Sequence, residues 1–162
     1  MSVKGWNSFE DFIAAANTSC NWIVLRNFEF LPENFFENDK DVDVLCDDLT
    51  VFIETMQLTK RSWGIAAYET YINNRKVPFD VRVIGDGYYD KLWQYKMLEN
   101  KILTDKFVPR MNDNDYFFSL IYHSTLQKEN IKVEYQHRLL NLAQILGIGE
   151  LLQSTTKDES HL

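Results

Sequence analysis

The sequence predicts an α+β fold: a small mixed sheet with an Asp-x-Asp strand, flanked by helices and followed by a C-terminal helical appendage. Up to about residue 85, short apolar runs typical of strands alternate with stretches of helical spacing. Beyond that point the apolar spacing is mostly helical. We expect one domain over residues 1–153, with a core at about 8–85, the appendage at about 88–149, and a flexible tail at 154–162.

The first two expected elements are a helix and a buried strand. The helix covers residues 8–16, with Ser8 as its N-cap and acidic residues in its first turn. The strand covers residues 21–26 and ends in Arg26 and Asn27. A cation and an amide at the end of a strand are two donors at a sheet edge, where ligands bind in open α/β sheets. The alternative is that Arg26 simply reaches solvent.

The stretch 40–46, Lys-Asp-Val-Asp-Val-Leu-Cys, is the predicted strand around which the site is built. Side chains alternate along a strand, so Asp41 and Asp43 share one face. Two carboxylates about 4 Å apart repel by roughly 4 kcal/mol at an effective dielectric near 20, and a cation or a proton relieves this. Oxygen donors without His or Cys suit Mg²⁺ or Mn²⁺ better than zinc. The alternative is a surface strand with two solvated acids.

The chain between and after these strands is expected to be helical and then to form a hairpin. One helical turn is expected over 31–36, with Pro32 at its first position, and a helix over about 48–58 with Asp47 and Asp48 at its N-cap. The hairpin pairs residues 65–72 with 77–84 across a turn at 73–76.

The returning strand of the hairpin carries a third acid, Asp80, among apolar residues. Asp80 shares a face with Arg82, while Phe79, Val81 and Val83 share the other. An acid in such a strand is costly unless it is paired or coordinated. Either Asp80 pairs with Arg82 or another base, or it joins Asp41 and Asp43 at a metal ion.

The appendage begins after a turn at 85–87, Gly-Asp-Gly. Helices are expected at about 88–98, 112–127 and 133–146, the last ended by Gly147 and Gly149, with a short extended piece at 107–109. The first of these helices is indicated by the spacing of Tyr88, Leu92, Tyr95 and Leu98. The last is expected to turn Tyr135, Leu139, Leu142 and Ile145 or Leu146 inward. Tyr88, Tyr89 and Trp93 are assigned to core packing, with stacking on a base or a sugar as the alternative.

Composition restricts the kinds of partner. There are 24 Asp and Glu against 17 Lys and Arg, a net charge of −7, which argues against a broad nucleic-acid surface but allows one nucleotide in a pocket. Cys20 and Cys46 match no metal spacing and indicate a reducing compartment. With no signal peptide pattern and no apolar run of spanning length, we expect a cytoplasmic protein without membrane contact.

Taken together, these motifs resemble the nucleotidyltransferase fold family of the polymerase-β-like superfamily. Members carry an Asp-x-Asp pair on the second strand and a third acid on a later strand, which correspond here to Asp41, Asp43 and Asp80. The likeness covers roughly residues 8–85. The family also carries Gly-Ser after the first strand, where this chain has Arg26 and Asn27 instead. Arg26 offers a bidentate cation and Asn27 an amide donor in place of that motif.

The resemblance implies a metal-dependent transfer of a nucleotidyl group from an NTP to a small acceptor, possibly sugar-related. Its catalytic and metal-binding residues would be the three aspartates, and its cofactor Mg²⁺ or Mn²⁺. Arg26, Asn27 and Arg82 would bind the nucleotide. Two alternatives stay open: a catalytically silent binding or interaction module of the same fold, and an unrelated α+β protein with an accidental Asp pair.

Overall fold

The computed structural model describes residues 5–64, 66–126 and 132–148, and it divides into two compact units, one up to Met111 and one from Asn112 on. The sequence predicted that the core would end near residue 85. The first unit extends further because it also contains the helix α4 (Lys91–Glu99) and the strand β7 (Pro109–Arg110), and β7 pairs in parallel with the first strand. The predicted tail, 154–162, lies outside the described residues.

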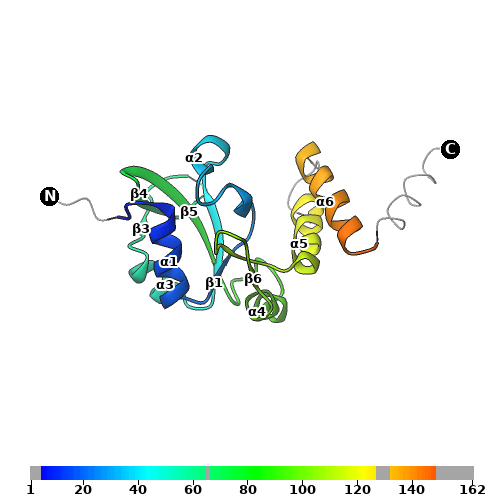
Figure 1. Ribbon diagram of the computed structural model, residues 1–162. Coiled ribbons are helices and arrows are strands. Elements are labelled where there is room, and N and C mark those ends of the chain that lie inside the picture. The colour runs from blue at the N-terminus through cyan, green and yellow to red at the C-terminus, as the bar shows by residue number, and fades with distance from the viewer. Residues whose placement is uncertain (1–4, 65, 127–131, 149–162) are drawn as a thin grey trace. The chain divides into compact units, whose positions relative to one another are not determined.

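The first unit is built on a mixed sheet of seven strands, in the order β3-β4-β5-β2-β1-β7-β6 (Figure 1). The central strand β2 is antiparallel to β1 and parallel to β5. These three strands carry the candidate site. The α+β class with a mixed sheet and C-terminal helices is confirmed. The strands are β1 (Trp22–Val24), β2 (Val42–Cys46), β3 (Thr59–Lys60), β4 (Tyr68–Ile72), β5 (Arg75–Val83), β6 (Ile102–Leu103) and β7.

Two helices, α1 (Phe9–Ser19) and α3 (Leu49–Thr55), contact each other and enclose the core against one face of the sheet (Figure 1). Their N-caps are those that the sequence predicted. The Ser8 hydroxyl accepts a hydrogen bond from the Asp11 amide, and the Asp48 carboxylate accepts one from the Val51 amide. Asp47 is not the cap; its carboxylate accepts a hydrogen bond from Asn21.

The core between the helices and the sheet consists of alternate strand residues and aromatic side chains from the helices. Phe12 of α1 stacks on Phe79 of β5, with ring centroids 5.1 Å apart, and Phe52 of α3 lies 5.8 Å from Trp22 of β1. Because alternate residues of β2 enter this core, the intervening residues, among them Asp43, face the other side of the sheet.

The connection between β1 and β2 differs from the prediction. It contains a 3₁₀ helix, η1 (Phe28–Phe30), and a short helix α2 (Phe35–Asn38), and Pro32 lies in the turn between them rather than in a helix. The helical turn begins later because Phe35 is buried against Phe9 of α1, with ring centroids 5.0 Å apart.

The helix α4 also differs from the prediction, which placed it at about 88–98 from the spacing of Tyr88, Leu92, Tyr95 and Leu98. It starts at Lys91, capped by Asp90, and both Leu92 and Tyr95 are exposed. Its buried residues include Gln94, which is fully buried because its side chain hydrogen-bonds to the turn after β5.

The second unit consists, in its described part, of the helices α5 (Asp113–Leu126) and α6 (Val133–Ile145), close to the predicted ranges. They contact each other through His123 and Tyr135, with ring centroids 5.7 Å apart. Of the residues of α6 expected to face inward, Leu142 is buried, and Tyr135, Leu139 and Leu146 are half-buried, whereas Ile145 is exposed. Gly147 follows α6 with φ +71°, the left-handed conformation typical of a glycine that ends a helix. Gly149 lies outside the described residues.

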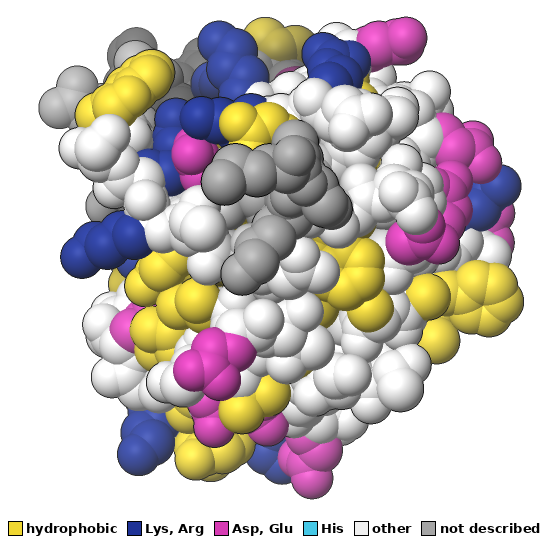
Figure 2. Space-filling view, turned by 90° about the vertical axis from the view of Figure 1, so that its left-hand side faces the viewer, with side chains coloured by type: hydrophobic (Ala, Val, Ile, Leu, Met, Phe, Trp, Pro, Cys, Tyr) yellow, Lys and Arg dark blue, Asp and Glu magenta, His cyan; other side chains and the backbone are white. Residues whose placement is uncertain are grey.

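The surface shows no single dominant charge on the face drawn in Figure 2, where basic and acidic side chains are interspersed and hydrophobic side chains form separate groups. None of the helices described is both long enough and apolar enough to cross a membrane.

Candidate functional site

The parallel pair β2 and β5 brings two aspartates to the same level of the sheet. Its register places Asp43 directly beside Asp80, and both lie on the face opposite the α1–α3 core. Asp41 lies two residues before Asp43, just outside β2, and is half-buried. The three predicted site acids are therefore within one small region, and their charges act on one another.

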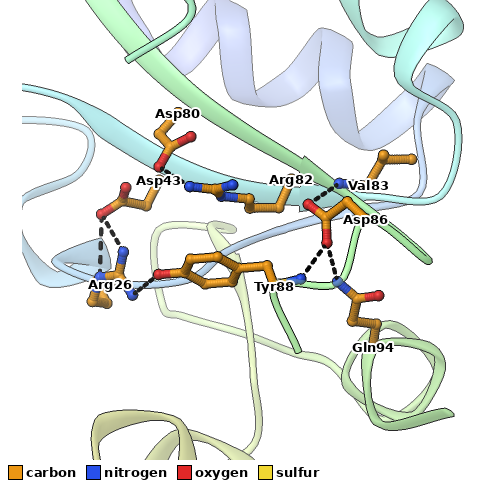
Figure 3. Close-up of polar contacts among 8 residues, drawn as sticks. All are labelled: Arg26, Asp43, Asp80, Arg82, Val83, Asp86, Tyr88 and Gln94. Atoms are coloured by element: carbon orange, nitrogen blue, oxygen red, sulfur yellow. Dashed lines mark hydrogen bonds and ion pairs between the residues drawn. The ribbon is translucent and has the colours of Figure 1, made fainter. Parts of the chain in front are cut away.

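Arg26 reaches this region because β1 and β2 are antiparallel, so the end of β1 lies beside the start of β2. The Leu25 amide donates a hydrogen bond to the Asp43 carbonyl at 2.8 Å. The Arg26 guanidinium follows, and its Nε and Nη2 both lie 3.2 Å from Asp43 Oδ2 (Figure 3). Arg26 is only 8% exposed, so it does not simply reach solvent. Asn27 adopts a left-handed conformation, with φ +58°, and precedes η1.

Arg82 is two residues beyond Asp80 on β5 and so lies on the same face. Its Nη2 is 3.1 Å from Asp80 Oδ2, the pairing that the sequence allowed as an alternative to a metal. Arg82 Nε is buried with no hydrogen-bond partner among the described residues. Because a buried donor without an acceptor is costly, this nitrogen suits a site that receives an acceptor from a ligand.

Tyr88 links the two arginines. Its hydroxyl accepts a hydrogen bond from Arg26 Nη1 at 3.2 Å, and the Arg82 guanidinium lies over its ring, 4.1 Å from the centroid (Figure 3). From the sequence, Tyr88 was expected to pack in the core at the start of a helix. The signal that could have placed it here is its position after a Gly-Asp-Gly turn that directly follows the strand of Asp80 and Arg82.

The turn is held by Asp86. Its carboxylate accepts hydrogen bonds from the amides of Val83 and Tyr88 and from the Gln94 side chain (Figure 3). Gln94 in turn accepts a hydrogen bond from the Gly85 amide at 2.7 Å. Gly85 has φ +86°, a conformation that favours glycine. The buried amide of Gln94 therefore fixes the turn to α4, and the turn positions Tyr88.

The electrostatics of the site follow from burial. Burial raises the pKa of Asp43 to about 6; Arg26 opposes the rise, while Asp41 and Asp80 add to it. Burial, Asp39 and Asp80 also raise the pKa of Asp41. Burial alone would lower the pKa of Arg26, but Asp43 and Tyr88 more than offset this and raise it, so the guanidinium stays charged. The site thus holds buried acids whose charge is only partly balanced.

The donor set fits a hard divalent cation in its chemistry, since it offers carboxylate oxygens and no His or Cys. In the present arrangement, no three His, Cys, Asp or Glu side chains of the described chain are placed to hold one metal ion. Figure 3 shows that the carboxylates of Asp43 and Asp80 are paired with Arg26 and Arg82. A cation would have to replace these two arginines as the partner of the acids.

Comparison of the chain with protein-family models, with curated proteins and with solved structures finds no match.

Proposed function

We propose that this protein is a nucleotidyltransferase that uses Mg²⁺ or Mn²⁺ to move a nucleotidyl group from an NTP to a small acceptor, such as a sugar-type compound. The observation that carries the proposal is the in-register pair Asp43 and Asp80 on adjacent parallel strands, with Asp41 two residues before. A bound cation explains why one face of the sheet keeps three half-buried acids that repel one another.

In the proposed reaction, an acceptor oxygen forms a bond to the α-phosphorus of the NTP. The bond from that phosphorus to the bridging oxygen of the β-phosphate breaks, pyrophosphate leaves, and the acceptor's proton passes to water. A bound divalent cation supplies charge neutralisation for the phosphates and for the attacking oxygen. The role of the three aspartates is to hold that charge at one place on the sheet.

Arg26, Asn27 and Arg82 are proposed to bind the phosphates. With a cation held by the aspartates, Arg26 and Arg82 would no longer pair with the carboxylates and would be able to donate to phosphate oxygens, for which the planar guanidinium fork is suited. Arg82 Nε, which has no acceptor among the described residues, is the donor that gains most from such a ligand.

A second candidate function is that of a catalytically silent module with the same fold, which binds a ligand or interacts with a partner protein. The ion pairs Arg26–Asp43 and Arg82–Asp80 favour it, because they neutralise two of the three acids without any metal.

The two candidates differ in how cation and nucleotide stabilise the protein. If the proposal is right, Mn²⁺ with an α,β-methylene NTP analogue raises the melting temperature more than either alone, since ligands that bind the native state stabilise it by mass action. Asp80→Asn should abolish this joint effect, whereas Asp105→Asn, which changes an exposed acid on another loop, should keep it.

The same samples, given NTPs with natural bridging oxygens, serve for a transfer assay that follows pyrophosphate release with candidate acceptors. A joint shift without release for any acceptor would favour the silent module. The absence of any shift with all four nucleotides at millimolar concentration, in folded wild-type protein, would overturn the nucleotide-binding site altogether.

A further inference from the structure

Tyr88 is placed to control both arginines of the site at once. Its hydroxyl accepts from Arg26, which is paired with Asp43, and its ring lies under Arg82, which is paired with Asp80. Asp43, Arg26, Tyr88, Arg82 and Asp80 thus form one continuous chain of contacts between the two in-register aspartates (Figure 3).

The two contacts of Tyr88 are of different kinds. The hydrogen bond to Arg26 depends on the phenolic oxygen, whereas the contact with Arg82 is a cation–π interaction that depends on the ring. A single substitution can therefore remove one and keep the other, because phenylalanine retains the ring without the hydroxyl.

A residue that positions both arginines would be needed once a cation is bound by Asp43 and Asp80. Each arginine then loses the carboxylate that fixes its long side chain, and a guanidinium with free rotamers is a weak phosphate ligand. Tyr88 does not depend on the aspartates for its own place, because its backbone is held by Asp86, and Asp86 by the fully buried Gln94 of α4.

We propose that Tyr88 is a positioning residue that holds the guanidinium groups of Arg26 and Arg82 together, facing the phosphates of the nucleotide, once a divalent cation has replaced them at Asp43 and Asp80. This inference rests on the proposed function for its ligand. Tyr88 would thus act beside the three aspartates, and the role of the Gly-Asp-Gly turn and of α4 would be to hold Tyr88 in place.

The test is a double-mutant cycle read by titration calorimetry. The full-length protein, loaded with Mn²⁺, is titrated with α,β-methylene analogues of ATP, GTP, CTP and UTP. For the analogue that binds wild type best, Tyr88→Phe should weaken affinity about 3- to 10-fold, the loss of a hydrogen bond to a charged group that acts indirectly. Tyr88→Leu, which removes the ring as well, should weaken it further. Tyr95→Phe, an exposed tyrosine on α4, is the matched control and should bind as wild type does.

The cycle separates positioning from a general structural role. In an Arg26→Lys background the effect of Tyr88→Phe should largely vanish, because the hydroxyl acts through Arg26; in an Arg82→Lys background it should persist. An unchanged affinity in Tyr88→Phe would overturn the inference, and so would an equal effect in both backgrounds.

A measurement without ligand keeps this result distinct from that of the proposed function. Nitrogen-15 NMR of the arginine side chains should show slower guanidinium rotation for Arg26 in wild type than in Tyr88→Phe. If wild type binds no nucleotide, the proposed function fails. In that case equal rotation rates in the two proteins would overturn the placement of Arg26 by Tyr88 as well, whereas a faster rate in Tyr88→Phe would support it.

Discussion

At the scale of single residues, Asp43 is the group whose state should change most with pH. Its pKa lies near 6 in the folded protein, against an ordinary value of 3.8, because burial disfavours its charge more than Arg26 favours it. Between these two values the folded protein binds more protons than the unfolded chain, so stability falls as pH rises. The side chain is 15% exposed, so the rise of its pKa from 3.8 to about 6 corresponds to about 2 to 3 kcal/mol of folding stability.

We therefore expect that the free energy of unfolding, measured by urea denaturation from pH 4 to pH 7, declines by up to this amount. Asp43→Asn should remove most of the decline, while Asp105→Asn, the exposed control, should retain it. If Asp43→Asn shows the same decline as wild type, the buried carboxylate is not its origin. At pH 7, Mn²⁺ should increase the free energy of unfolding of the wild-type protein, because a bound cation favours the ionised carboxylate of Asp43. It should not do so for Asp43→Asn.

At the scale of elements, the β4–β5 hairpin sets the position of Asp80. The register pairs Ile72 with Arg75, which leaves a two-residue turn, Asn73 and Asn74, with φ +51° and +57°. Both residues are left-handed, as in a type I′ turn, where asparagine is tolerated and alanine is not. The sequence predicted this hairpin but made the turn two residues longer.

Asn74→Ala should accordingly lower the free energy of unfolding by about 1 kcal/mol, whereas Asn74→Gly should equal or exceed wild type. Urea denaturation of the three proteins measures this. Asn100→Ala is the control, since Asn100 is also exposed but has φ −98°, and it should change stability by less than about 0.5 kcal/mol. Equal losses for Asn74→Ala and Asn74→Gly would show that the side chain of Asn74, not its conformation, matters.

At the scale of the whole molecule, the division after Met111 predicts two regions that open separately. Phe52 is fully buried in the first unit, and Phe52→Ala should cost about 3 to 5 kcal/mol there. Hydrogen exchange should then accelerate in β1, β2 and β5, with the protection of α5 and α6 unchanged. Val51→Ala, on the exposed side of the same helix, should leave both regions as in wild type. A matching acceleration in α5 and α6 would mean that the chain unfolds as one unit.

Features that depend on residues close in sequence were predictable. The caps by Ser8 and Asp48 and the alternation that places Asp80 opposite Phe79 all follow from local spacing, and each is present. The two-residue strands β3 and β6 were missed, and β7 was expected only as a short extended piece at 107–109. So short a segment has no period of its own and becomes a strand only by pairing with a neighbour.

For the site, the sequence by itself determined which residues carry the charge: Asp41, Asp43, Asp80, Arg26 and Arg82 were all selected from it. Only the tertiary structure decided which of them meet. The parallel register of β2 and β5 sets Asp43 beside Asp80, and the antiparallel register of β1 and β2 sets Arg26 on Asp43. Tyr88 joined them because a buried Gln94 fixes the turn that carries it. Local patterns specify the face on which a side chain lies, whereas the partner across that face depends on contacts between segments far apart in the chain, which no local spacing encodes.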